Sequence, residues 1–474
     1  MYLFDSVSSR HLDVSFARSG LPEALLMMRA AHSVWSYVSM LDKTGHVWCI
    51  SGPGNNGGDA YGVATLALMT GRSVSLYQEG SLSKTAKVVA NFARKVGVKI
   101  FKNLPSLDEM TDQDIIIDGL LGTGLNRPPS GAYSVIIEWI NLAKNNGTKI
   151  VSIDIPSGLD ASSGTAPGDA IAADMTIMCL SAKQGCYTGL GPDLCGDLYF
   201  SDLGCLNPEE HVKPNSILIT SENIDKLKRT KSGHKGTHGT LLVLGGWSTM
   251  EGAGCLAGIA GLKAGAGKVY ICGPEFPDKP MELISVDRDI DCFRQALSRS
   301  NAVVAGPGLG NNGGAFLKLA WESNVPLVMD ADGLNWLARE KPPSRKGGWV
   351  GTPHPGEAKT LLGRHVDNRF EAISELQTIY GGEWVLKGAG TLVGHDPIYI
   401  NPFANSILGT AGSGDVLAGI IGGLLAQGYK YPSHAGVWLH SRAAELLLAA
   451  GNASIIASDL IEPIGRALLE IMED

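Results

Sequence analysis

Short apolar segments rich in β-branched residues recur along this chain, and most of them alternate with stretches of helical periodicity. In the first part of the chain, strands are predicted at residues 46–50, 73–77, 114–118, 149–154 and 175–180. Such alternation is typical of β-α-β units, in which helices connect parallel strands. The chain is therefore predicted to be an α/β protein built on mostly parallel sheets.

The length of 474 residues is too great for one hydrophobic core, which stops growing at about 250 to 300 residues. Between residues 185 and 215 the sequence is rich in Gly, Pro, Asp and Asn and has no long periodic segment. A second series follows, with strands predicted at residues 241–244, 268–272, 302–305, 326–329, 384–386 and 391–393, and helices at 414–427 and 435–450. We therefore expect two α/β domains in tandem, residues 1–214 and 221–474.

Charge and composition exclude several classes of partner. A formal net charge of −8 argues against nucleic acid, whose binding surfaces are usually basic. The longest apolar stretch, residues 416–426, is shorter than the roughly 20 residues that span a membrane, and the N-terminus does not resemble a secretory signal. The eight cysteines include no C-x-x-C pair, so reduced thiols in a cytoplasmic protein are expected.

A glycine-dense segment, SGPGNNGGD at residues 51–59, lies between a predicted strand and a helix predicted over residues 60–70. Exposed backbone N–H groups and a helix N-terminus together favour anion binding. A plain tight turn is the alternative, but Asn55, Asn56 and Asp59 supply side-chain oxygens that a turn does not need. The glycine spacing is neither that of the GxGxxG fingerprint nor that of a Walker loop.

Two further predicted strands end in related segments, DGLLGTGLNRP at residues 118–128 and DIPSGLD at residues 154–160. Loops beyond the carboxyl ends of parallel strands can converge on one site, although each aspartate could instead cap a helix. Asn56, Asp118 and Ser157 offer hard oxygen ligands for a cation, which leaves Asp154 as a candidate acid or base.

The segments GNNGGDAYGVA, DGLLGTGLNRP and IDIPSGLDASSG strongly resemble the signature segments of NAD(P)H-hydrate epimerase domains, over about residues 1–214. The resemblance implies a Rossmann-like N-terminal domain, a potassium ion held by Asn56, Asp118 and Ser157, and Asp154 beside the reacting nicotinamide ring. The residues it implies for binding the hydrated dinucleotide are Asn55, Asn56, Gly57, Gly58, Asp59, Gly122, Thr123, Gly124, Leu125, Asn126, Arg127 and Pro128.

The most specific segment of the second part is NSILGTAGSGD at residues 405–415, which leads into a predicted helix. Small residues before a helix let backbone N–H groups reach a phosphate, and Asp415 beside this anion hole can take a proton from a substrate hydroxyl. An N-capping role for Asp415 is the alternative. The segment KGAGT at residues 387–391 is either a nucleotide cradle or a β-hairpin turn, and His354 by itself is more typical of a structural residue.

The segment GTAGSGD resembles the anion hole and catalytic aspartate of the ribokinase-like superfamily. With HKGTHG, GPGLG, DADGLN, TPHPGE and KGAGT, it is similar to ADP-dependent NAD(P)H-hydrate dehydratase domains over about residues 221–472. The resemblance implies that Ala253, Gly308, His354 and Asp415 contact the hydrated substrate. The residues it implies for binding the adenine nucleotide are Lys387, Gly388, Ala389, Gly390, Thr391, Asn405, Gly409, Thr410, Gly412, Ser413 and Gly414.

The two resemblances together imply a bifunctional repair enzyme, both isomerase and lyase, that acts on hydrated NADH and NADPH. The first domain interconverts the R and S epimers, and the second dehydrates the S epimer with Mg²⁺ and with ADP as phosphoryl donor. Asp154 and Asp415 are the expected catalytic residues, and a homo-oligomer is also implied. The alternative hypothesis is a ribokinase-like small-molecule kinase fused to a non-catalytic nucleotide-binding module.

Overall fold

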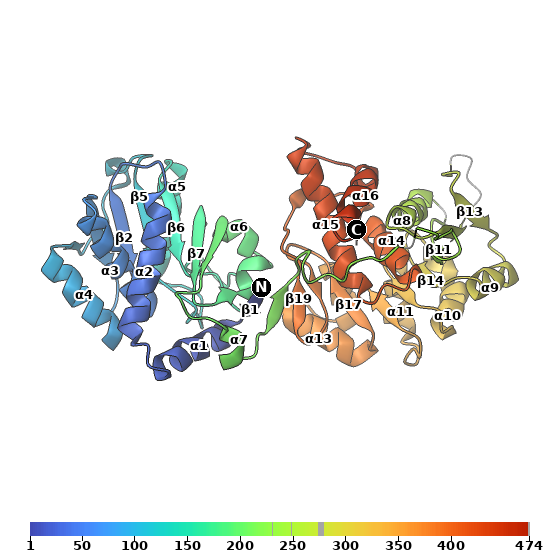
Figure 1. Ribbon diagram of the computed structural model, residues 1–474, viewed down its shortest axis with the longest axis horizontal. Helices are drawn as coiled ribbons and strands as arrows, with labels where there is room; N and C mark the ends of the chain where they lie inside the picture. Colours follow the sequence, from blue (N-terminus) through green and yellow to red (C-terminus); the bar gives the residue numbers. More distant parts are fainter. Residues whose placement is uncertain (230, 248, 274–278, 473–474) are drawn as a thin grey trace. The chain divides into compact units, whose positions relative to one another are not determined.

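The computed structural model describes residues 1–229, 231–247, 249–273 and 279–472 (Figure 1). The chain forms two compact units, Met1–Ile217 (unit 1) and Leu218–Asp474 (unit 2). Within the described residues, none of the helices has the length and apolar character needed to cross a membrane. Each unit is built around its own sheet.

The central sheet of unit 1 has seven parallel strands in the order β4-β3-β2-β5-β6-β7-β9. Their bounds are β2 (Val47–Ser51), β3 (Val74–Gln78), β4 (Lys99–Phe101), β5 (Ile115–Gly119), β6 (Lys149–Ile153), β7 (Met175–Cys179) and β9 (Asp197–Ser201). Alternate residues of β5 enter different cores, since Ile115 and Ile117 pack on one side of the sheet and Ile116 on the other. A sheet covered on both faces explains why these strands are continuously apolar.

Helices cover both faces of this sheet. In chain order they are α1 (Ser6–Arg18), α2 (Glu23–Ser39), α3 (Asn55–Met69), α4 (Lys84–Val96), η1 (Leu107–Glu109), α5 (Ala132–Asn145), η2 (Gln184–Tyr187), α6 (Gly191–Cys195) and α7 (Pro208–His211). Helices α2, α3 and α4 share one core, and α5 belongs to the core on the opposite side. The helix predicted over residues 60–70 begins earlier than expected, because the chain turns at Gly54, with φ +88°, and residues 55–59 already form its first turn.

The first strand of the chain pairs with two short strands from much later in the sequence. Strand β1 (Tyr2–Phe4) pairs antiparallel with β10 (Ser216–Leu218), and parallel with β8 (Ala182–Lys183). In the second pairing Leu3 lies opposite Ala182 and Phe4 opposite Lys183. Leu3 and Phe4 are buried, so the first residues of the chain are an integral part of this unit.

Unit 2 contains a sheet in which β13-β12-β11-β14-β15-β16-β17 are parallel and β18 and β19 are added antiparallel. The bounds are β11 (Thr240–Leu244), β12 (Lys268–Cys272), β13 (Leu283–Val286), β14 (Ala302–Ala305), β15 (Leu327–Met329), β16 (Trp349–Gly351), β17 (Glu383–Leu386), β18 (Leu392–Val393) and β19 (Ile398–Ile400). The predicted two-series α/β organisation is thus confirmed, and every predicted strand of both series is found.

The most deeply buried helix of unit 2 is α14, which packs against α8, α15 and strand β14 within one core. The helices of this unit are α8 (Glu251–Lys263), α9 (Ile290–Ser298), η3 (Asn311–Gly313), α10 (Gly314–Glu322), α11 (Asp332–Glu340), α12 (Pro355–Leu362), α13 (Arg369–Tyr380), η4 (Ser406–Leu408), α14 (Ser413–Ala426), α15 (Pro432–Ala449), η5 (Ala457–Leu460) and α16 (Ile461–Leu469). Glycines on α14 permit close packing: a Cβ on Gly419 would lie 2.1 Å from the carbonyl oxygen of Ala257 on α8. The absence of a side chain at Gly419 therefore lets α14 and α8 lie close together.

Candidate active sites

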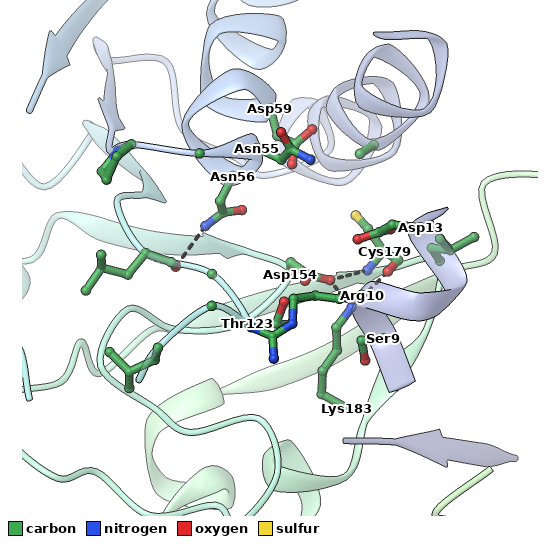
Figure 2. A pocket seen from close by; sticks show the side chains of 18 of the residues that line it. Ser9, Arg10, Asp13, Asn55, Asn56, Asp59, Thr123, Asp154, Cys179 and Lys183 are labelled. Carbon is green, nitrogen blue, oxygen red and sulfur yellow. Dashed lines mark hydrogen bonds and ion pairs between the residues drawn. The ribbon is translucent and has the colours of Figure 1, made fainter. Parts of the chain in front are cut away.

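Unit 1 contains a cavity of about 800 Å³ beside the points where β2, β5, β6 and β7 end (Figure 2). All residues predicted to bind the hydrated dinucleotide line it except Gly57 and Gly58. These two glycines serve packing instead: a Cβ on Gly57 would lie 2.0 Å from the carbonyl oxygen of Gly52, and one on Gly58 would lie 2.4 Å from the sulfur of Met27. The glycines therefore let α3 approach its neighbours closely, while Asn55, Asn56 and Asp59 face the cavity.

The predicted cation ligands are brought together around the carboxylate of Asp118. Ser157 donates to it from its Oγ at 2.6 Å and from its backbone N at 2.9 Å, and Ser152 Oγ donates at 2.8 Å. The backbone of Leu121 joins the group, because its carbonyl oxygen accepts from Asn56 Nδ2 at 2.9 Å and from Ser157 Oγ at 3.1 Å. Burial raises the pKa of Asp118, and the hydrogen bonds from Ser157 oppose the shift.

One acceptor in this group has no hydrogen bond. The amide oxygen Oδ1 of Asn56 is buried and has no donor among the described residues. Buried acceptors without a partner are uncommon, and an amide oxygen of this kind is a suitable ligand for a cation. Leu121 O is a further oxygen in the same place, which the sequence could not indicate because it belongs to the backbone.

Asp154 lies at the end of β6, with its side chain in the cavity and its backbone in the left-handed region at φ +69°. Non-glycine residues seldom adopt this conformation, and it is commoner at functional sites. The carboxylate accepts from the backbone N of Cys179 at 2.9 Å and forms an ion pair with Lys183. Lys183 is 2% exposed, and its Nζ also donates to the carbonyl oxygens of Cys179 and Ser181, each at 2.8 Å. A buried, fully bonded lysine thus holds Asp154 in place.

Asp13 and Asp59 face the same cavity (Figure 2), and Glu23 also lines it. Asp13, on α1, is accessible from the cavity but surrounded by protein, and this partial burial, with the charges of Asp154 and Glu23, raises its pKa to about 6 against the opposing effect of Lys183. Burial also raises the pKa of Asp59 well above its usual range, helped by the charges of Asp154 and Asp13. Asp154, Asp13 and Asp59 all interact electrostatically with one buried lysine, Lys183.

In unit 2, Asp415 lies in the first turn of α14, directly after the small residues of the GTAGSGD segment. The first backbone N–H groups of a helix have no partner within it, so this terminus can bind an anion. Burial, with the negative charges of Asp330 and Glu357, raises the pKa of Asp415 to about 7 against the opposing effect of Lys387. A carboxyl group that titrates near neutral pH beside an anion site is suited to act as a general base.

Lys387 connects several acidic groups next to this helix. Its Nζ lies 2.7 Å from Asp330 Oδ1 and 3.7 Å from Glu357 Oε2, and Thr352 Oγ1 donates to the same Asp330 oxygen at 2.8 Å. Burial alone would lower the pKa of Lys387, but the two carboxylates outweigh it and raise the pKa. A Cβ on Gly414 would lie 3.1 Å from Lys387 Nζ, so the ammonium group lies against the anion-binding loop.

The KGAGT segment is the turn of a hairpin, since β17 and β18 pair antiparallel with Leu386 opposite Leu392. Arg369 supports this turn by donating to the carbonyl oxygens of Leu386 at 3.0 Å, Ala389 at 2.5 Å and Gly390 at 3.3 Å. The predicted hairpin turn is therefore found in the structure. The turn nevertheless places Lys387 beside the anion-binding loop, and a lysine that contacts a bound nucleotide would have to lie there.

His354 is the N-cap of α12. Its Nδ1 accepts from the backbone N of Gly356 at 3.0 Å and of Glu357 at 3.3 Å, and the Glu357 side chain accepts from the backbone N of His354 at 2.8 Å. This capping box leaves the ring itself 56% exposed. His354 thus has a structural function, and its other ring nitrogen, Nε2, lies 3.7 Å from Glu357 Oε1.

The remaining predicted residues of unit 2 are placed as follows. Gly308 and Ala253 lie side by side, because a Cβ on Gly308 would be 2.9 Å from the Ala253 methyl group. Asn405 caps η4 by accepting from the backbone N of Ile407 at 3.1 Å, and its Nδ2 donates to Glu445 at 3.2 Å. Gly409 and Thr410 follow η4 and lead to the N-terminus of α14.

Two family models match the chain. One, described as NAD(P)H-hydrate dehydratase, matches residues 241–466, and the other, described as YjeF-related protein N-terminus, matches residues 23–185. A bifunctional NAD(P)H-hydrate repair enzyme of Coxiella burnetii is 34% identical over 480 residues, which cover 97% of this chain and 97% of that protein. The enzyme of the same name from Escherichia coli is 35% identical over 469 residues, covering 94% of this chain and 90% of its own length.

A solved structure supports the predicted fold. A ribokinase-like superfamily protein from Enterococcus faecalis matches 55% of this chain and 98% of its own, with a TM-score of 0.51 at 21% identity. At that identity the match concerns the fold alone. It confirms the expectation of a ribokinase-like domain in this chain.

Proposed function

The chain belongs to the family of bifunctional NAD(P)H-hydrate repair enzymes, and from this membership we propose a division of work between its two units. Unit 1 interconverts the R and S epimers of hydrated NADH and NADPH. Unit 2 dehydrates the S epimer and consumes ADP, which leaves AMP and phosphate. The observation that carries the proposal is that each unit places an aspartate near a lysine at the carboxyl ends of its parallel strands, Asp154 near Lys183 and Asp415 near Lys387.

In unit 1 we propose that Asp154 exchanges a proton with the hydrated nicotinamide ring and that Lys183 positions it. The dinucleotide would bind along the first turn of α3 and the loop after β5, whose residues line the cavity. Asp13, with a pKa of about 6, provides a second carboxyl group that can be protonated near neutral pH. Two carboxyl groups in one recess fit a reaction that must both remove and return a proton.

We propose that potassium binds in unit 1 to the oxygens of Asn56, Asp118, Ser157 and Leu121. The buried Asn56 Oδ1 without a donor supports the assignment, as does the concentration of oxygens around Asp118. When bound, the ion would supply a positive charge that compensates the buried Asp118 carboxylate. The chain's own contribution is to fix the loop after β5 through Leu121, which leads directly into the residues proposed to bind substrate.

In unit 2 we propose that Asp415 takes the proton of the 6-hydroxyl group. The hydroxyl oxygen then forms a bond to the terminal phosphorus of ADP while the bond from that phosphorus to the bridging oxygen breaks, which releases AMP. The backbone N–H groups at the start of α14 and the ammonium of Lys387 stabilise the charge on the transferred group. Loss of phosphate from the ring carbon, followed by loss of a ring proton, restores the reduced nicotinamide.

We propose that Mg²⁺ binds together with the nucleotide in unit 2. Asp330 Oδ1 is engaged by Lys387 and Thr352, while its Oδ2 lies 3.8 Å from the position that a Cβ on Gly414 would take. A carboxylate oxygen next to the anion-binding loop is the hard ligand that Mg²⁺ prefers. When bound, the ion would neutralise phosphate charge.

Two expectations from the sequence remain predictions. The homo-oligomer is tested by light scattering on the purified protein, and the cytoplasmic location by fractionation of its source cells. Neither affects the assignment of residues to the two sites.

The test is to incubate the protein with both epimers of hydrated NADH, ADP and Mg²⁺ and to follow the return of reduced-nicotinamide absorbance. We expect the whole mixture to convert faster than spontaneous epimerisation allows. With Asp154→Asn only the S fraction should convert rapidly, and with Asp415→Asn no fraction should convert although the epimers still interchange. Accumulation of a stable phosphorylated product would instead support the small-molecule kinase.

A further inference from the structure

Three side chains that the proposed reactions do not use come together in unit 2. Glu383 is the first residue of β17, His395 follows β18, and His434 lies in the first turn of α15. Their ligand atoms all lie within 4.8 Å of one another, and His395 Nε2 is 3.3 Å from Glu383 Oε1. Residues from two loop-strand junctions and one helix therefore converge on one point.

The polar atoms of this cluster are buried but unsatisfied. His434 is 6% exposed, and neither of its ring nitrogens has a hydrogen-bond partner among the described residues. Glu383 Oε1 and His395 Nε2 are also buried; they contact each other at 3.3 Å, an ion-pair distance, and have no further partner among the described residues. Nearly all buried polar groups in folded proteins have a partner, and here one ligand atom from each of Glu383, His395 and His434 lies close to the other two. A ligand between these three atoms would supply the partner that His434 lacks.

Aromatic rings hold His434 in this orientation. The ring of Tyr399 meets it edge-on, with centroids 4.2 Å apart and planes at 89°, and Tyr431 does so at 5.7 Å and 81°. Strand β19, which carries Tyr399, and α15 are thus in direct contact (Figure 1). Such packing restricts the rotation of the imidazole and keeps it directed toward Glu383 and His395.

We propose that Glu383, His395 and His434 bind a divalent transition-metal ion, with Zn²⁺ as the best match. Two imidazoles and one carboxylate are a ligand set that zinc uses, and hard ions such as Mg²⁺ and Ca²⁺ prefer oxygen alone. Ligand atoms about 2.1 Å from a tetrahedral ion are separated by roughly 3.4 Å, so the Glu383–His395 distance already fits and His434 needs only a small movement. Water would supply the fourth ligand of a tetrahedral ion.

The bound ion would have a structural role, because the site is remote from the proposed catalytic residues of unit 2. Glu383 is at the start of β17 and Lys387 follows its end, a separation of about 13 Å along a strand. The ion would link β17 and the β18–β19 connection to α15, which packs against the helix that carries Asp415. Metal binding should therefore raise thermal stability without being required for dehydration.

The experiment uses full-length protein without a polyhistidine tag, stripped of metal by a chelator. Zn²⁺ is titrated calorimetrically, Co²⁺ is added as a spectroscopic probe, and the melting temperature is followed with each. We expect one equivalent to bind, a Co²⁺ spectrum of nitrogen and oxygen ligands without a sulfur band, and a rise of about 5 °C at a hundredfold excess over Kd.

The variants His434→Gln and His395→Gln should each weaken Zn²⁺ binding at least about 100-fold, because loss of a ligand exceeds the 10- to 100-fold effect of losing a supporting residue. His365→Gln is the matched control, since His365 is exposed and lies on a separate loop. His395 is half-exposed, so its variant remains informative if His434→Gln fails to fold. Absence of Zn²⁺ binding to the stripped protein, or equal binding by the two variants and the control, would overturn the proposal and leave a simple His395–Glu383 ion pair.

Discussion

The rate of dehydration should depend on pH through the ionisation of Asp415. The charge of Asp330 should determine the pH at the midpoint of this dependence. With a pKa of about 7, only about 9% of Asp415 would be ionised at pH 6, compared with about 91% at pH 8. If the ionised form is the base, kcat/KM for the S epimer should rise about tenfold between these two values. Below pH 6 it should fall about tenfold for each further unit.

The substitution Asp330→Asn separates this explanation from a general effect of pH. Asp330 is the principal charge that raises the pKa of Asp415, and it also occupies Lys387. Asparagine has the same shape and keeps an oxygen for the hydrogen bond from Thr352, but it removes the negative charge and frees Lys387 to face Asp415. Both consequences stabilise the ionised carboxylate, so the midpoint should move to lower pH by about one unit.

The assay follows the return of reduced-nicotinamide absorbance from purified S epimer at saturating Mg²⁺ and ADP, between pH 5.5 and 8.5. Because Mg²⁺ and ADP are saturating at each pH, protonation of the nucleotide does not alter the measured rate. Asp367→Asn is the control, because Asp367 is exposed and does not contribute to the pKa of Asp415. A wild-type profile that is flat between pH 6 and 8, or an Asp330→Asn profile with an unchanged midpoint, would refute the assignment of Asp415 as the base.

Three other predictions concern unit 1. Asp154→Asn should slow epimerisation at least about 100-fold and leave dehydration of purified S epimer unchanged, as measured by chromatographic separation of the epimers. Replacing potassium by a large organic cation, or Asn56 by Leu, should reduce epimerisation alone; equal loss of both activities would contradict a potassium site in unit 1. Gly57→Ala should lower the free energy of unfolding by about 1–3 kcal/mol in urea titration, because its Cβ would lie 2.0 Å from a carbonyl oxygen, while Gly465→Ala has open space and should have little effect.

Much of the fold could be predicted because central parallel strands leave a strong pattern. Strands such as β5 and β14 are buried on both faces, so their residues are continuously apolar and end at glycine or aspartate. The edge strands β4 and β9 were not predicted, since they are partly exposed and their sequences resemble loops. The early start of α3 was missed because asparagine and glycine are poor helix formers, whereas here the close approach to neighbouring backbone determines the conformation.

The candidate sites were predictable where function lies in consecutive residues and not where it depends on tertiary contacts. Asp154 directly follows an apolar strand and Asp415 a glycine-rich segment, and both were predicted from these local patterns. Lys183 belongs to no motif, and its importance depends on a strand pairing with residues near the start of the chain. Asp13 is an ordinary polar residue of an amphipathic helix until the cavity beside it raises its pKa. No local sequence pattern carries this information.

The pairing of β1 with β8 has a practical consequence for handling the protein. Phe4 lies opposite Lys183, the residue that holds Asp154, so residues 2–4 form part of the scaffold on which epimerisation depends. Deletion of these residues, or a bulky fusion placed against them, would disturb Lys183 and would be recorded as an enzymatic defect far from the altered position. Affinity tags are therefore better attached at the C-terminus, and surveys of sequence variation should count changes at Leu3 and Phe4 as changes to an active site.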